Sequence, residues 1–168
     1  MGLESCLIYL TVKSAVSQAE IKDIIENAGA IFLANKSNID QLDTYRHFYF
    51  EIRSDFGLTE VDILLPPGET MITNMSVRFS ILSPSSVIDQ TFSFLNKLTI
   101  SQTIKVFDAD NNLKELDLNV EEFKLNADKI RKRQIVINNK TGLVIEGGSK
   151  TTDYIHSNNL MDKIWGQN

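Results

Sequence analysis

The stretch that decides the fold is residues 45–65, which read YRHFYFEIRSDFGLTEVDILL. Apolar and polar side chains alternate in both halves of this stretch, and Asp55-Phe56-Gly57 lies between the halves. Alternation with a period of two is typical of a β-strand with one buried and one exposed face, and a short glycine-containing turn joins two such strands into a hairpin. We therefore predict antiparallel strands over residues 45–53 and 59–65.

The same alternation assigns the side chains of this hairpin to two faces. Toward the core we expect Phe48, Phe50, Ile52, Val61, Ile63 and Leu65, with Arg46 at the edge of that face. Toward solvent we expect Tyr45, His47, Tyr49, Glu51 and Arg53 from the first strand and Glu60 and Asp62 from the second. The sequence thus predicts that Tyr49, Glu51, Glu60 and Asp62 share one water-facing platform.

The residues before the hairpin predict a strand, a helix and a short strand. Residues 5–12 (SCLIYLTV) are nearly all apolar, which favours a central strand covered on both faces. Ser17-Gln-Ala-Glu20 fits a helix-starting capping box, and apolar residues follow at helical spacing up to position 28. Residues 31–34 are expected to form a short strand and residues 35–43 a loop.

The residues after the hairpin predict further elements of both kinds. We expect strands over 75–82, 103–107 and 113–118, a helix that begins at Ser83-Pro84, a third helix from Asn119 to about Arg133, and a hairpin over 134–138 and 143–146. The resulting fold class is α+β, a mostly antiparallel sheet with two to three helices packed on one face. Residues 1–148 are predicted to form a single domain, followed by a polar C-terminal tail, 149–168, with a short docked helix as an option.

Several classes of site are excluded by composition. The 168 residues include one cysteine and two histidines, too few for a disulfide framework or a Cys/His zinc site of the usual spacing. Cys6, inside an apolar run, is expected to be a small buried hydrophobe. Glycine-rich phosphate loops are absent from the sequence, so no cofactor and no metal are predicted. The sequence has no transmembrane stretch and no recognisable export signal, so we expect no membrane contact and a cytoplasmic location.

Charge is distributed unevenly along the chain. The formal net charge is −5, and residues 36–69 contain three Lys/Arg against seven Asp/Glu. An acidic surface repels phosphate backbones and attracts basic partners. The basic run 129–133 is interpreted as the basic end of a helix rather than a nucleic-acid contact, so a basic protein partner and no nucleic acid are predicted.

Two functions from different classes remain open. The first is a non-enzymatic protein-binding module, of which a bacterial toxin-neutralising (immunity-type) protein is one form. Its predicted contact residues are Asp40, Asp43, His47, Tyr49, Glu51, Glu60 and Asp62. The alternative is a small hydrolase or ligand-binding domain in which His47 is the acid/base and Glu51 or Asp62 orients it. A homodimer is also open, formed by pairing of strands such as Thr59–Leu65 across two copies.

Overall fold

The computed structural model describes residues 5–39, 44–55, 57–80, 85–101, 104–108 and 113–116, together with seven separate residues: Leu125, Lys129, Lys132, Ile135, Val136, Asn139 and Lys140. In chain order the elements are β1 (Ser5–Ser17), α1 (Gln18–Asn27), β2 (Ile31–Phe32), the 3-10 helix η1 (Ala34–Lys36), β3 (Arg46–Ser54), β4 (Gly57–Leu65), β5 (Met71–Ser80), α2 (Ser85–Ser101), β6 (Ile104–Asp108) and β7 (Lys114–Leu116).

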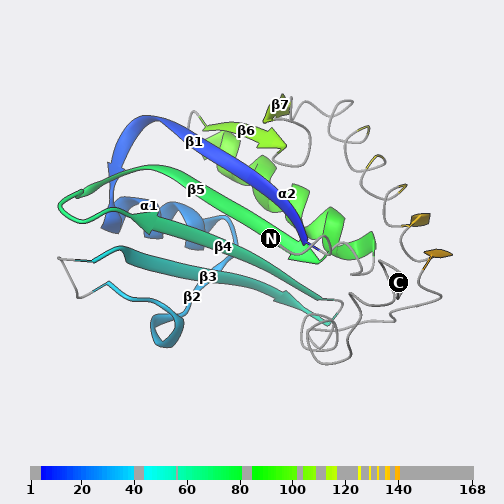
Figure 1. Ribbon diagram of the computed structural model, residues 1–168, viewed down its shortest axis with the longest axis horizontal. Coiled ribbons are helices and arrows are strands. Elements are labelled where there is room, and N and C mark those ends of the chain that lie inside the picture. Colours follow the sequence, from blue (N-terminus) through cyan, green and yellow to red (C-terminus); the bar gives the residue numbers. More distant parts are fainter. Residues whose placement is uncertain are drawn as a thin grey trace, which may run out of the picture.

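The described strands form one seven-stranded sheet in the order β2-β3-β4-β5-β1-β6-β7. Every neighbouring pair is antiparallel. Figure 1 shows α1 and α2 together behind this sheet, so one face of the sheet is covered by helices. We call the opposite face the outer face. The predicted α+β class, with an antiparallel sheet and helices on one face, is confirmed.

The core lies between the sheet and the two helices. Alternate residues of the central strands point into it, among them Ile8 and Leu10 of β1 and Val77 of β5, which are at most 1% exposed. Ile21 and Ile25 of α1 are fully buried against them. Burial of one such side chain contributes roughly 1.5–3 kcal/mol. Because these residues point toward the helices, the residues between them on each strand point to the outer face.

Helix α1 begins and ends where the sequence predicts. The Ser17 hydroxyl accepts a hydrogen bond from the backbone N–H of Glu20 at 3.3 Å, which satisfies one of the unpaired donors of the first turn. After the helix, Gly29 has a φ of 110°, a backbone conformation that favours glycine. The chain then turns back into β2, which places β2 and η1 beside β3.

The predicted hairpin is confirmed as β3 and β4, but three other expectations in this region are wrong. Residues 59–62 are not free to pair across a dimer, because over this stretch β4 is paired with β3 on one side and with β5 on the other. The strand over residues 5–12 is central but not covered on both faces, since Tyr9 is 38% exposed. The short strand expected over 31–34 is limited to Ile31–Phe32, and η1 follows at Ala34.

Beyond β7 the separately described residues test two further expectations. Leu125, Lys129 and Lys132 are helical, in agreement with the helix predicted over 119–133 at those positions. Ile135 and Val136 are also helical, so the strand predicted over 134–138 is wrong there. Apolar β-branched residues occur in both buried strands and helices, and a short run does not separate the two. The strand over 143–146 and the tail 149–168 lie outside the described residues.

Candidate functional site

The outer face brings together the side chains that the alternation grouped. In the β3–β4 ladder Tyr49 lies opposite Asp62 and Glu51 lies opposite Glu60. The β4–β5 ladder adds Arg78, opposite Glu60. His47, Tyr49, Glu51, Glu60 and Asp62 are therefore neighbours on one face, as predicted. Asp40 and Asp43, the other two predicted contact residues, lie outside the described residues.

Glu51 is the most deeply buried carboxylate of this group. It is 2% exposed, and it accepts bonds from Lys36 Nζ at 2.5 Å and from Arg53 at 2.8 Å. A buried carboxylate is costly unless it is paired. Burial alone would raise the pKa of Glu51, but the hydrogen bonds from Arg53, Lys36 and Tyr49 outweigh burial and lower it. Glu51 is therefore a buried anion at neutral pH.

Tyr49 bridges the two carboxylates that the register places opposite each other. Its hydroxyl lies 2.5 Å from Glu60 Oε1 and 3.1 Å from Glu51 Oε1. A phenol has one proton to donate, so the shorter contact to Glu60 is the stronger bond. Burial, together with both carboxylates, raises the pKa of Tyr49, which keeps the hydroxyl protonated. Like charges directly opposite each other destabilise a sheet, and Tyr49 offsets part of that repulsion.

A second set of contacts continues the network toward β5 and the start of β3. Arg78 Nε lies 2.6 Å from Glu60 Oε2 and 3.6 Å from Asp62 Oδ2. Burial acts to lower the pKa of Arg78, but the charges of Glu60 and Asp62 outweigh it and raise the pKa. His47 Nε2 lies 2.7 Å from Asp62 Oδ1. We call the connected set of Lys36, His47, Tyr49, Glu51, Arg53, Glu60, Asp62 and Arg78 the outer-face network.

The exposure of this network corrects the prediction of an acidic, water-facing platform. Side-chain exposure is 44% for Lys36, 53% for Arg53 and 47% for Arg78. It is only 3% for Glu51, 17% for Glu60 and 16% for Asp62. Tyr49 is also buried, at 4%. The cations thus cover the carboxylates, and three Lys/Arg side chains neutralise three carboxylates.

The physical reason for this error lies outside the hairpin. The segment around η1 runs beside β3, where Asn38 bridges to His47, and it places Lys36 Nζ 4.8 Å from the centre of the Tyr49 ring. Arg78 arrives from β5, a neighbour that the hairpin alone does not identify. Both cations were missed by sequence reasoning. The outward position of Arg78, between the core residues Val77 and Phe79, was the one available signal.

Arg46 is a separate case on the core side of β3. Expected at the edge of the core face, it is buried at 4% exposure. Its guanidinium donates to the backbone carbonyl of Glu69, while its Nε has no hydrogen-bond partner. Arg46 thus ties the start of β3 to the β4–β5 turn without taking part in the outer-face network.

The outer face carries charged side chains that are paired with one another, and it includes one His–Asp contact. The His47–Asp62 pair satisfies the distance for an oriented acid/base, with Asp62 and not Glu51 as the orienting group. Among the described residues, no group of three or more His, Cys, Asp or Glu side chains could hold a metal ion. Within the same residues, no helix is long and apolar enough to cross a membrane.

Comparison with known proteins adds no relative: no family model, no curated protein and no solved structure matches the chain.

Proposed function

We propose that this protein is a non-enzymatic binding module that contacts a basic protein partner through the outer face of its sheet. The observation that carries the proposal is the outer-face network, in which each long charged side chain is already held by its neighbours. Ordering a flexible side chain at an interface costs about 0.5–1.5 kcal/mol. A surface of prepaired Lys, Arg and His side chains avoids most of that cost.

The outer face also offers aromatic residues suited to anchoring a partner. Tyr9 is 38% exposed, and it lies opposite Ser76 on one side and Phe107 on the other. Tyrosine and arginine are enriched among the residues that dominate interface affinity. Tyr9 therefore occupies the middle of the proposed contact surface, between the outer-face network and β6.

Preference for a basic partner comes from carboxylates outside the network. The chain has a net charge of −5, and such a charge raises the rate at which basic molecules approach. Asp55 and Glu69 are exposed at the two ends of β4, and neither forms an ion pair with a residue that the structure describes. A basic protein toxin would be a partner of this chemistry, in which case the module neutralises it.

Two variants that each replace a large exposed side chain by serine test the contact surface. Tyr9→Ser removes an exposed side chain from the outer face, and Ile100→Ser removes a 78% exposed side chain from α2, which packs on the other face. We expect Ile100→Ser to capture the same protein from native lysate as the unmodified chain, and Tyr9→Ser to lose it. Equal capture by both variants would remove the outer face from the proposal.

The alternative function is an acid/base enzyme or ligand-binding domain centred on His47. The 2.7 Å contact between His47 Nε2 and Asp62 favours it, because an oriented imidazole is the usual general base. Cys6, the one cysteine of the sequence, is buried at 3% exposure, so it is not offered to a substrate as a nucleophile. Comparison of the unmodified chain with His47→Gln in broad hydrolase and ligand panels tests this alternative, which predicts a loss specific to the variant.

A further inference from the structure

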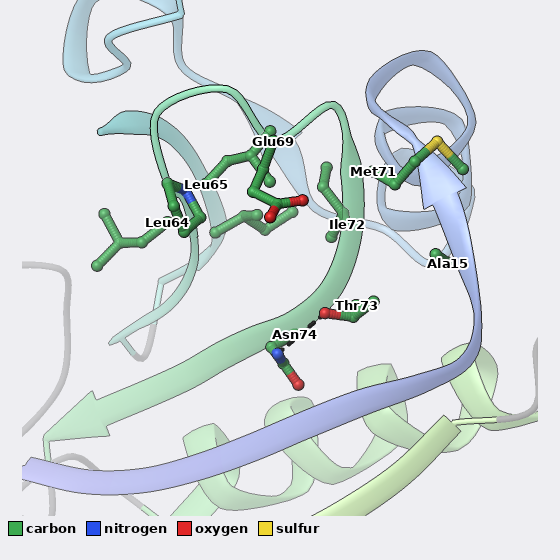
Figure 2. Close-up of a pocket in the computed structure, with 10 residues that line it drawn as sticks. Ala15, Leu64, Leu65, Glu69, Met71, Ile72, Thr73 and Asn74 are labelled. Atoms are coloured by element: carbon green, nitrogen blue, oxygen red, sulfur yellow. Dashed lines mark hydrogen bonds between the residues drawn. The ribbon is translucent and has the colours of Figure 1, made fainter. Parts of the chain in front are cut away.

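A pocket of about 380 Å³ lies where strands β4 and β5 separate. Their ladder pairs Thr59–Asp62 with Ser76–Phe79 and goes no further, although β4 continues to Leu65 and β5 begins at Met71. On the other side of β5 the β1 register shifts between Thr11 and Val16, where β1 is irregular. The two arms of the β4–β5 hairpin are therefore apart at this end, and the pocket fills the space (Figure 2).

The lining of this pocket combines apolar walls with one carboxylate. The buried side chains of Ile63, Leu65 and Ile72 line it, together with Met71, which is 43% exposed. Figure 2 shows Glu69 at the top of the hairpin, with its carboxylate oxygens turned toward the space between the two arms. Glu69 forms no ion pair with any residue that the structure describes. Arg46, the neighbouring cation, is buried and donates to the main-chain carbonyl of Glu69 instead.

We propose that this pocket receives a lysine or arginine side chain of the partner protein. Such a side chain has an apolar stem and a cationic end, so the stem matches the aliphatic walls and the end matches the Glu69 carboxylate. The volume of about 380 Å³ is at the lower end of the range of about 300–1,000 Å³ that is usual for ligand pockets, so one long side chain fits within it.

The position of the pocket favours a side chain of the partner over a free amine. Leu64 and Asn74 line the pocket, and their places in the alternation put both side chains on the outer face. Leu64 is opposite His47 in the β3–β4 ladder, so the pocket adjoins the outer-face network. A partner on the outer face therefore reaches the pocket without crossing an edge of the sheet. The inference therefore rests on the proposed function, because it requires a partner protein on the outer face.

Nuclear magnetic resonance titration with two blocked amino acids tests the pocket directly. The probes are N-acetyl-lysine amide and its uncharged counterpart N-acetyl-norleucine amide, added at millimolar concentration to the isotope-labelled full chain. We expect the lysine probe to shift the backbone amides of residues 63–74 and the norleucine probe to bind more weakly. Glu69→Gln should weaken the lysine probe about fivefold, the effect of one partly exposed ion pair. Asp55→Asn, at the other end of β4, is the matched control and should leave binding unchanged.

The outcomes separate this inference from the proposed function. No shift in residues 63–74, or equal binding of the lysine probe to Glu69→Gln and the unmodified chain, overturns the pocket. If probe binding depends on Glu69 but Glu69→Gln still captures the partner fully, the pocket binds a free amine and not a side chain of the partner, and the inference is wrong. Partner capture that is lost in Tyr9→Ser but kept in Glu69→Gln refutes the pocket while the outer-face proposal survives.

Discussion

Replacement of Tyr49 by phenylalanine tests the centre of the outer-face network. Phenylalanine keeps the buried ring and removes only the hydroxyl, which lies 2.5 Å from Glu60 Oε1 and 3.1 Å from Glu51 Oε1. One hydrogen bond to a charged group contributes about 1.5–3 kcal/mol to stability. Its loss also leaves two carboxylates opposite each other with one fewer donor. We therefore expect Tyr49→Phe to lower the free energy of unfolding by about 2 kcal/mol.

The matched control is Tyr9→Phe on the same face of the sheet. Tyr9 is 38% exposed, and its hydroxyl can bond to water, so the same chemical change should cost less than about 0.5 kcal/mol. Urea denaturation followed by far-ultraviolet circular dichroism measures both variants, and an unchanged m-value confirms that the same surface is exposed on unfolding. Equal stability of the two variants would refute the bridging role of the Tyr49 hydroxyl.

Three further measurements follow from the burial and charge of single residues. The pKa of Glu51 is lowered in the folded protein, so the ion pairs of Glu51 stabilise the fold fully above the ordinary pKa of 4.5, and this stabilisation is lost as the pH falls through the lower pKa of the folded state. Denaturation midpoints should therefore fall less steeply between neutral and acidic pH for Glu51→Gln than for the unmodified chain. Ile25→Ala should lower the free energy of unfolding by about 2–5 kcal/mol, whereas Ile31→Ala, at 60% exposure, should change it by less than about 0.5 kcal/mol; a small effect at Ile25 would contradict its burial against the sheet. The Cys6 thiol, 3% exposed, should react with a maleimide slowly in the native protein and rapidly in denaturant, and rapid native labelling would place it outside the core.

Local patterns in the sequence predict the parts of the fold that depend on near neighbours. Alternation over residues 45–65 depends only on the pleat of each strand, so it assigns Phe50 and Val61 to the core and Glu60 and Asp62 to the other face. The capping box at Ser17 likewise depends on contacts three residues apart. Both predictions hold because every interaction that they need lies within the segment itself.

Burial of the outer-face carboxylates could not be predicted in the same way. Whether Glu51 is exposed depends on Lys36, which η1 brings over the strand, and on Arg53, whose side chain turns back onto it. Exposure of Glu60 depends on Arg78, and thus on β5 being the neighbour of β4. Strand order is set by packing of the whole sheet, and one segment contains little information about it.

This covering of the carboxylates changes which groups can recognise a basic partner. A partner cation that approached Glu60 or Asp62 would have to displace Arg78, and exchange of one cation for another gains little free energy. Attraction specific to a basic side chain must therefore come from a carboxylate with no cation of its own, which is the situation of Glu69 at the pocket. The aromatic and arginine side chains of the outer face would then supply shape and contact area. On this argument, Glu69→Gln should reduce the salt dependence of partner binding more than Glu60→Gln does. The reverse order would show that the carboxylates of the outer-face network, and not Glu69, attract the basic partner.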